Sequence, residues 1–504
     1  MSFSEKDKKF YSRIPEGVKT AVLVTLSSIL FLTSIISTFK KAGSDAYKKH
    51  GSFDSYTLQA LAWRRGEAKL DKNYPHLELA IINREWLATH DKDDYMAYRE
   101  TFGDVNAPIQ HVEGNEYYVS FPPTPSIPML VLSWFYGGDT PDNLMTILYV
   151  AGSFALAILI GRRLGYGCIA SLMGGLLSCA ASGAFFLAAN KLAGGPWFAA
   201  QALSLLLTLA AFYTMLSKRK VGMYLAFVFL ALAVGCRPFQ IIFFVLLAYV
   251  AAKKYDFKIL KTWKYYIAPA IIGGAYMWYN YIRFGNVLEF GHNYLPEFMR
   301  TEYSKFALEN VKGNISAYFK TFPTYNNGKL EFSQFGFTFY VSNVIFIFAG
   351  LALLVFAVYA ILRFVDLRRT GNRRRSGVNA GAGEMIVIPN TVEPIRKFSV
   401  FRDTSIVEVL ILTVGGAIEL FLLMMHRTAG GWQFGMRYTV DIIPAALLLA
   451  GYCLKPFSRK VREYESDNTS KFALMARGAL VLLSAVLVMF GMWLNIYGSY
   501  LMLK

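Results

Sequence analysis

Long apolar blocks recur through the whole chain and limit its possible folds more than any other feature. Most of them run to roughly 17–24 residues, and a helix of about 20 residues crosses a hydrocarbon layer about 30 Å thick. The blocks that we interpret as membrane spans cover about residues 18–38, 143–161, 168–189, 196–216, 221–235, 239–252, 265–282, 342–364, 405–425, 439–454 and 474–496. The sequence therefore predicts an all-α polytopic membrane protein with about eleven transmembrane helices.

Composition and length fit a membrane domain better than a set of soluble domains. Hydrophobic residues make up 55% of the 504 residues, and the mean hydropathy is +0.35, above the usual range of soluble proteins. We expect one membrane-embedded domain over residues 1–504, with outer loops over 39–125 and 283–341 and a flexible basic cytoplasmic loop over 365–404. The first outer loop is expected to carry juxtamembrane helices. The apolar segment 126–136 is too short to cross and predicts a helix that lies in the interface or re-enters from outside.

The net charge of +18 arises largely from basic clusters between apolar blocks. These clusters are Arg162/Arg163, Lys218–Lys220, Lys253–Lys264, Arg363–Arg375 and Lys455–Arg462. Eleven crossings with an inside N-terminus put every cluster on the cytoplasmic side, as the positive-inside rule requires. No basic stretch alternates with stacking aromatic residues on a soluble module, which argues against a nucleic acid partner. The first block is too long for the apolar part of a signal peptide, so we expect a retained anchor.

Cysteines and histidines give no sign of a metal site or a disulfide framework. The four cysteines all lie in or beside apolar blocks, at Cys168, Cys179, Cys236 and Cys453. The six histidines fall on the predicted outer side, where their placement is also explained by their exclusion from the spans, and no HxxH or HxxxH spacing occurs. The sequence therefore predicts no metal ligands.

One aspartate in the first outer loop stands at the head of an amphipathic stretch. Asp54 follows a Gly-Ser break, and Tyr56 and Trp63 come after it at helical spacing. Two interpretations stay open: Asp54 caps the helix that begins there, or it is a reactive carboxylate held at the membrane surface. If Asp54 is only a cap, Glu289 and Asp104 are the next candidate carboxylates.

Three arginines share a position at the outer ends of predicted spans. They are Arg237, Arg283 and Arg437. A charge at the end of a span can simply extend to the interface. Three guanidinium groups on the same side as Asp54 also suit a phosphate, because guanidinium binds phosphate oxygens in a bidentate manner and keeps its charge.

Taken in order, these features resemble the GT-C superfamily of multispan glycosyltransferases, especially the bacterial branch related to protein-mannosyl and aminoarabinose transferases. The matching pieces are Asp54, Tyr-Tyr-Val-Ser-Phe-Pro-Pro-Thr-Pro at 117–125, Cys-Arg-Pro at 236–238, Arg-Phe-Gly-Asn-Val-Leu-Glu-Phe-Gly at 283–291 and Gln-Phe-Gly-Met-Arg-Tyr at 433–438. Two departures are a long first loop with an acidic run at 91–94, and Ser120, which stands where some relatives carry a basic residue.

The resemblance implies an enzyme of the bacterial cytoplasmic membrane that takes a sugar from a polyprenyl-phosphate carrier. It would attach the sugar, with inversion, to a hydroxyl acceptor outside. On this reading Asp54 is the general base, and the three arginines stabilise the leaving phosphate. The implied substrate pocket contains Tyr56, Tyr117, Tyr118, Glu289, His292 and Tyr438. No cofactor is expected, although in some relatives a divalent metal takes the role of the arginines.

Two other classes of membrane protein remain open. A transporter or flippase of lipid-linked sugars usually shows repeats, or broken helices with polar groups at the midplane, whereas the polar residues here lie at the outer rim and no repeat is visible. A polymerase or ligase of lipid-linked saccharides would share the predicted architecture. The chain has no Walker or GxGxxG loop for a nucleotide sugar, which favours a lipid-borne donor.

Overall fold

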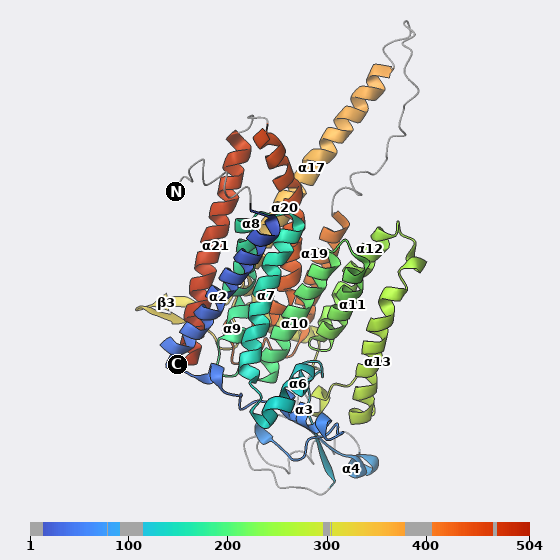
Figure 1. Ribbon diagram of the computed structural model, residues 1–504, viewed down its shortest axis with the longest axis vertical. Coiled ribbons are helices and arrows are strands. Elements are labelled where there is room, and N and C mark those ends of the chain that lie inside the picture. Colours follow the sequence, from blue (N-terminus) through green and yellow to red (C-terminus); the bar gives the residue numbers. More distant parts are fainter. Residues whose placement is uncertain are drawn as a thin grey trace.

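Long helices packed side by side form the body of the protein (Figure 1). The computed structural model describes residues 14–77, 79–90, 114–295, 303, 305–378, 406–466 and 471–504. The helices of this bundle are α2 (Glu16–Lys41), α7 (Asp142–Leu164), α8 (Cys168–Gly175), α9 (Gly183–Ala188), α10 (Pro196–Met215), α11 (Lys220–Val234), α12 (Phe244–Lys254), α13 (Lys264–Phe284), α17 (Ile345–Val378), α19 (Ile406–Met425), α20 (Ile443–Ser466) and α21 (Lys471–Leu503).

The predicted class of all-α membrane protein is confirmed. In the described ranges every predicted span contains helix. Six helical stretches there are long and apolar enough to cross a membrane: Glu16–Lys41, Asp142–Leu164, Pro196–Met215, Ile406–Met425, Arg437–Lys455 and Gly478–Leu503. The other predicted spans are shorter, interrupted or less apolar, so the count of eleven and the orientation stay predictions.

The centre of the bundle is α10, which packs between α7 and α11. Its side chains are buried on most sides, as expected for a helix that is apolar all round. Small residues allow close approach elsewhere: a Cβ on Gly161 of α7 would lie 2.9 Å from the Ser171 Oγ atom of α8. Tight packing of this kind, together with polar contacts, holds helices together where lipid gives no hydrophobic drive.

One predicted span is broken in the structure, and a predicted break between two others is present. The span predicted over 168–189 consists of α8, a π-helical turn at Leu176–Ala180 and the short α9. Ser182 starts α9 by accepting a hydrogen bond from the Ala184 amide at 3.3 Å, which caps the new helix. The predicted break between α11 and α12 is also present, as an extended Arg237 followed by a 3-10 turn, η5 (Pro238–Phe243).

Smaller elements cover the lower end of the bundle in Figure 1. The first outer loop contributes α3 (Ser55–Arg64), α4 (Arg84–Thr89) and an antiparallel pair of strands, β1 (Ala80–Asn83) and β2 (Asn115–Tyr118), with Ala80 opposite Tyr118. The predicted short helix at 126–136 is α6 (Ser126–Tyr136), which packs on α3. This segment therefore contains helices, as predicted, while their position at the membrane stays a prediction; Asp104 lies outside the described residues.

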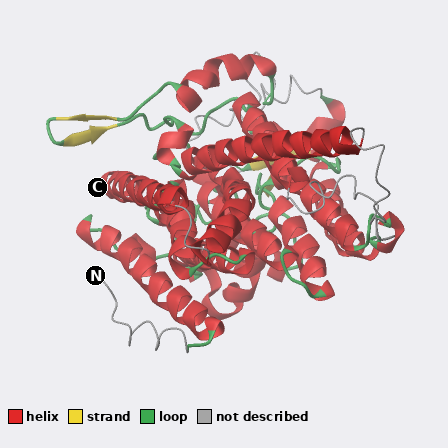
Figure 2. Cartoon of the chain, turned by 90° about the horizontal axis from the view of Figure 1, so that it is seen from above, coloured by secondary structure: helices red, strands yellow, loops and turns green. Residues whose placement is uncertain are grey.

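The segment predicted as the second outer loop carries η7 (His292–Tyr294), α15 (Leu308–Phe319), a hairpin of β3 (Thr324–Asn326) and β4 (Lys329–Glu331), and α16 (Phe339–Ser342). Figure 2 shows the hairpin extending away from the bundle. At the other end, α17 continues as a helix to Val378 and projects beyond its neighbours (Figure 1). The beginning of the predicted flexible loop 365–404 is therefore helical, and residues 379–404 lie outside the described part of the chain.

Candidate functional site

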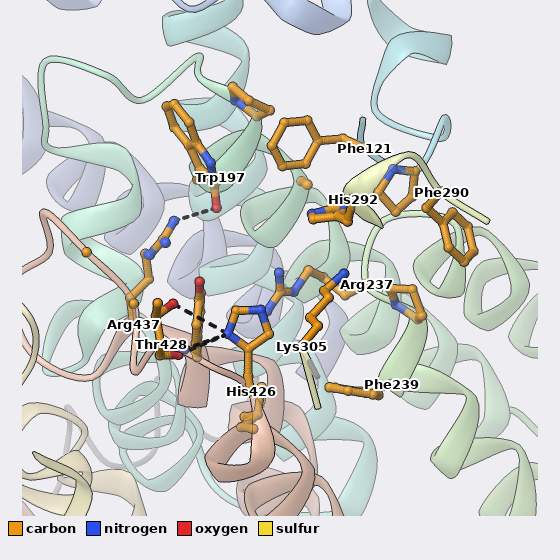
Figure 3. Close-up of a pocket in the computed structure, with 18 of the residues that line it drawn as sticks. Phe121, Trp197, Arg237, Phe239, Phe290, His292, Lys305, His426, Thr428 and Arg437 are labelled. Carbon is orange, nitrogen blue, oxygen red and sulfur yellow. Dashed lines mark hydrogen bonds between the residues drawn. The ribbon is translucent and has the colours of Figure 1, made fainter. Parts of the chain in front are cut away.

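A cavity of about 1240 Å³ lies at the end of the bundle that carries α3 and α6 (Figure 3). Its walls come from segments far apart in sequence: the start of α3, the segment after β2, the start of α10, the turn before η5, the loop after α13, α15, and the loop between α19 and η8 (Arg437–Ile442). Among the described residues that line it, three side chains are cationic, Arg237, Lys305 and Arg437, and one is anionic, Glu289. The cavity is therefore suited to an anion.

Arg237 is the cation best placed to bind a ligand. Its Nε atom donates to the Oδ2 atom of Asp441 at 2.7 Å, and its guanidinium lies 5.3 Å from the ring centre of Tyr438. The side chain keeps 25% of its exposure, while the Asp441 side chain keeps 1%. Within the described part of the chain, the two terminal nitrogens of Arg237 have no hydrogen-bond partner. They are left to donate to an oxygen anion in the cavity.

The local sequence explains the direction of Arg237. A residue before proline is pushed out of helical geometry, and Arg237 has φ −138° and ψ 102° before Pro238. Gly235 lets another segment come close, since a Cβ there would lie 2.1 Å from the Thr124 Oγ1 atom and 2.2 Å from the Tyr276 hydroxyl. The amide of Thr124 donates to the Gly235 carbonyl at 3.1 Å. The Cys-Arg-Pro motif therefore ends α11 and turns its arginine to the cavity.

A buried polar network stands behind Arg237. The Oδ1 atom of Asp441 accepts from the Gln201 side chain at 3.0 Å, and its carbonyl accepts from the Gln240 side chain at 3.1 Å. Gln240 also donates to the Oε1 atom of Glu419 at 3.1 Å and accepts from the Thr208 hydroxyl at 2.8 Å. These contacts fix the carboxylate of Asp441, and Asp441 in turn fixes the guanidinium of Arg237.

Arg437 lines the opposite part of the cavity beside Trp197 (Figure 3). Its Nη1 atom donates to the Trp197 carbonyl at 2.7 Å, and its guanidinium lies 4.6 Å from the ring centre of Phe198. The side chain is buried, and its Nε atom has no hydrogen-bond partner among the described residues. Arg437 therefore adds a fixed positive charge to the wall and one unused donor.

The Gln-Phe-Gly-Met-Arg-Tyr motif builds the loop that holds Arg437. The side-chain amide of buried Gln433 donates to the carbonyls of Ala429 (3.0 Å) and Phe335 (3.1 Å). Its oxygen accepts from the amide of Arg437 at 3.2 Å. Gly435 has φ +72°, and a Cβ there would lie 2.5 Å from Ser342, so this turn requires glycine.

Arg283, the third predicted phosphate ligand, lies outside the cavity lining. Its side chain is fully buried, and its guanidinium donates to the Val119 carbonyl at 2.8 Å and to the Asn280 side chain at 2.9 Å. It also lies 4.1 Å from the ring centre of Tyr279. The structure gives Arg283 an internal role, joining the end of α13 to the segment that carries Phe121 and Pro122 into the cavity wall.

Asp54 lies next to the cavity without lining it, whereas Phe53 and Tyr56 on either side both line it. Asp54 holds the N-cap position of α3, yet its carboxylate accepts no hydrogen bond from the helix. Burial raises the pKa of this half-buried carboxyl, while a hydrogen bond from its own backbone amide, and then His50 and His76 nearby, oppose that rise. The capping interpretation therefore lacks its hydrogen bond to the helix.

The first turn of α7 fixes the segment just before Asp54. The Oδ1 atom of Asp142 accepts from the Gly51 amide at 2.7 Å. The side-chain amide of Asn143 donates to the carbonyls of Ala46 at 2.9 Å and Lys49 at 3.1 Å. The chain that leads into α3 is thereby held against the bundle, which places Asp54 and its neighbours at a defined position beside the cavity.

The six predicted pocket residues divide into two groups. Tyr56, Glu289, His292 and Tyr438 line the cavity, and Tyr117 and Tyr118 do not. The hydroxyl of Tyr56 is buried without a hydrogen-bond partner among the described residues. Glu289 is engaged by its own loop, because it accepts from the Gly291 amide at 2.6 Å and from the Asn293 side chain.

The two remaining tyrosines serve the outer strands instead. Tyr117 and Tyr118 are buried on β2, where Tyr118 packs against Phe284 and its hydroxyl donates to Glu116 at 2.9 Å. Their predicted place in the pocket came from the resemblance of the segment 117–125, which also contains Phe121. Alternation along the strand and the turn after it carry Phe121, and not the tyrosines, to the cavity.

Several lining residues were not predicted from the sequence. Lys305 and His426 stand near Arg237 in Figure 3, and Trp197 and Phe121 form an edge-to-face pair with ring centres 6.2 Å apart. Burial, with the positive charges of Lys305 and Arg237, lowers the pKa of His426 to about 4. Burial and the same positive charges also lower the pKa of His292. His292 was predicted to line the pocket, whereas no motif marks Lys305, Trp197 or His426, so only the fold brings these three to the cavity.

The site offers no obvious metal centre. In the described ranges, no group of three or more histidine, cysteine, aspartate or glutamate side chains is arranged to hold a metal ion. The arrangement combines guanidinium donors, a half-buried carboxylate and aromatic rings around a large cavity, which suits an anionic substrate with a ring-shaped portion. Comparison with protein-family models and with curated proteins found no match to this chain.

Proposed function

We propose that this protein is an inverting glycosyltransferase that moves a sugar from a polyprenyl-phosphate carrier to a hydroxyl acceptor at the outer face of the membrane. The observation that carries the proposal is the pair of unpartnered terminal nitrogens of Arg237 facing a cavity of about 1240 Å³. The likeness of the motifs to the GT-C superfamily is a second, weaker support.

The chemistry of the donor fits these groups. When the bond between sugar and phosphate breaks, the phosphate gains negative charge, and donors fixed in advance stabilise that charge without reorganisation. Arg237 supplies two such donors, and Arg437 supplies positive charge from the other wall. Arg283 is left out of this assignment because its guanidinium is engaged inside the protein.

The acceptor side of the reaction is assigned to Asp54 and the aromatic wall. The attacking hydroxyl must lose a proton, and a carboxylate whose pKa is raised by burial is a stronger base than an exposed one. Trp197 packs edge to face with Phe121, with ring centres 6.2 Å apart, and at a tilt with Phe53, with ring centres 5.4 Å apart. Aromatic faces of this kind suit the apolar faces of a sugar ring.

Transfer in proteoliposomes tests the proposal. Purified protein is given synthetic polyprenyl-phosphate sugars with a labelled sugar and a mixture of hydroxyl-bearing envelope acceptors. We expect labelled product and released polyprenyl phosphate. Arg237→Ala is expected to remove activity, and Arg237→Lys to retain part, because lysine keeps the charge and loses the fork. Arg219→Ala, an exposed change at the other end of α11, is the control. Failure of a folded parent protein to transfer any tested sugar would contradict the proposal.

The substitution Asp54→Asn distinguishes a role of Asp54 as a general base from a role as a helix cap. Asparagine caps a helix about as well as aspartate but takes no proton, so we expect normal folding, normal donor binding and a loss of turnover above roughly 100-fold. Asp54→Glu moves the carboxylate by about 1 Å and is expected to keep little activity. An asparagine variant with near-parental turnover would return Asp54 to a structural role and direct the search to other carboxylates.

A transporter or flippase of lipid-linked sugars is the second candidate. Glu419 is fully buried within α19 and bonded to Gln240, and the helix over 168–188 is broken by a π-helical turn. Buried carboxylates and broken helices are typical of transport pathways. Movement of a fluorescent polyprenyl-phosphate sugar between leaflets, without any transfer to acceptors, would favour this candidate. Transfer from oligosaccharide donors in preference to single sugars would favour a polymerase or ligase.

A further inference from the structure

Two turns at the end of the bundle opposite the cavity lie side by side and form one surface. The first joins α10 to α11, and the second, 255–263, joins α12 to α13. Lys254 links them by donating to the Met215 carbonyl at 3.2 Å and to the Ser217 carbonyl at 2.9 Å. The rings of Tyr224 and Tyr265 also meet, 4.5 Å apart. We call these two turns the basic edge.

The basic edge carries a strong excess of positive charge. In these turns and the first residues of α11 and α13, the basic side chains without an ion pair to a described residue are Lys218, Arg219, Lys220, Lys258, Lys261 and Lys264. Asp256 is the only acidic residue between positions 215 and 264 of the sequence. The neighbouring Lys253 is excluded because it pairs with Glu408 at 2.8 Å.

Large apolar side chains project from the same turn between the lysines. Leu260 is 90% exposed and Ile259 68%, and Phe257 and Trp263 are also more than half exposed. Exposed apolar groups that alternate with lysines are typical of a segment lying in a membrane interface.

The backbone of this turn is fixed in an uncommon shape. Asp256 and Phe257 have φ +50° and +59°, a region that a bulky residue rarely adopts without a compensating reason. The amide of Phe257 donates to the Ala252 carbonyl at 2.8 Å, and its ring contacts Tyr249 with ring centres 5.9 Å apart. The turn is therefore an ordered element that presents its apolar residues outward.

The length of α13 sets the depth of the basic edge. This helix runs from Lys264 at the basic edge to Phe284, just before the loop that lines the cavity, and comprises 21 residues. At about 1.5 Å per residue it spans roughly 30 Å, which equals the thickness of a hydrocarbon core. The basic edge and the cavity therefore meet opposite faces of a membrane that the bundle crosses.

We propose that the basic edge is a binding site for anionic phospholipids in the leaflet remote from the cavity. The lysines at 258, 261 and 264 contact the phosphate headgroups, and Leu260 and Trp263 enter the acyl region below them. Charge complementarity selects anionic over zwitterionic lipid, because a basic group near an anionic surface gains attraction that a neutral headgroup does not offer. This site is independent of the function proposed for the cavity.

Local quenching tests this site in the full-length protein. A bimane probe is attached to Leu260→Cys in a Cys168→Ala background, because the other three cysteines are buried. The protein is placed in bilayers that contain equal fractions of phosphatidylglycerol and phosphatidylcholine, with brominated acyl chains on one lipid or the other. We expect brominated phosphatidylglycerol to quench the probe at least threefold more efficiently, and high salt to remove most of the preference.

Two triple variants provide the comparison. Exchange of the lysines at 258, 261 and 264 for glutamine is expected to abolish the preference for phosphatidylglycerol. Exchange of Lys312, Lys320 and Lys329, which are exposed at the other end of the molecule, is expected to leave it unchanged. Equal quenching by both brominated lipids in the parent, or no quenching by either, would overturn the proposal, as would a preference that survives both glutamine exchange and high salt.

Discussion

Replacement of Asp441 by asparagine tests whether this carboxylate holds Arg237 ready for a phosphate. Asp441→Asn keeps the shape of the side chain and an oxygen that can still accept from Arg237 or Gln201. It removes the negative charge that now lies 2.7 Å from the Nε atom of Arg237. The arginine would then stand at the cavity without a counter-ion.

The size of the effect follows from burial. Removing one partner of a fully buried ion pair costs about 3–5 kcal/mol in folding free energy. Arg237 retains 25% of its exposure and asparagine retains a neutral hydrogen bond, so we discount this to about 1–3 kcal/mol. The affinity for phosphate should rise in the asparagine variant. A carboxylate and a phosphate on either side of a guanidinium repel each other across roughly 7 Å, worth about 2 kcal/mol at an effective dielectric constant near 20.

Thermal melting in neutral detergent, with and without a short polyprenyl phosphate, measures both quantities. We expect the asparagine variant to melt at a lower temperature and to be stabilised more by the ligand than the parent is. Glu408→Gln is the matched control, since it breaks the pair of a buried carboxylate with Lys253 at 2.8 Å on the opposite side of the bundle. It should melt lower with an unchanged response to the ligand. Weaker binding of the phosphate by Asp441→Asn would refute the reasoning.

Three further outcomes are expected. Arg283→Ala should lower the free energy of unfolding by about 2–4 kcal/mol through its lost internal hydrogen bonds, measured by melting; a parent-like melt with lost donor binding would make it a ligand instead. Gly235→Ala should cost about 1–3 kcal/mol, because its Cβ would overlap Thr124, whereas Gly274→Ala, with open space around it, should be neutral or stabilising in the same assay. The value of kcat/KM should fall on the acidic side with a midpoint above pH 3.8, because burial raises the pKa of Asp54. A base is lost as the pH falls through its pKa. A midpoint at or below pH 3.8 would contradict the role of Asp54 as the base.

The helical bundle was the most predictable part of the protein. Apolar runs of about 20 residues leave a chain few choices in a membrane, since only a helix satisfies its backbone hydrogen bonds within the segment. The break at Cys236-Arg237-Pro238 was also visible, because proline constrains the residue before it. The π-helical turn at Leu176–Ala180 was not predicted. It packs against α7 and against α21, which lies far away in the sequence, so no local pattern marks it.

The cavity was predictable only where a motif marked its residues. Arg237 and Arg437 were predictable because they stand in the Cys-Arg-Pro and Gln-Phe-Gly-Met-Arg-Tyr segments. The proline, glycine and glutamine of these segments shape the turns that hold the two arginines. Lys305 and His426 had no such neighbours, and they approach Arg237 because α15 packs on α19 and draws the two loops together. An antiparallel bridge between Phe306 and His426 joins the two loops. Contacts between residues so far apart in the sequence cannot be predicted from local sequence patterns.

The three arginines show why position at a span end does not decide function. All three are held by protein groups, and the difference lies in what remains unused. Arg283 has both sides of its fork engaged, by Val119 and Asn280, and it packs between aromatic rings. Arg237 donates to Asp441 only through its Nε atom, and its two terminal nitrogens are left facing the cavity. An ion pair through Nε is therefore the arrangement that orients a guanidinium for a ligand, because it fixes the plane of the group and leaves its outer edge to bind two oxygens.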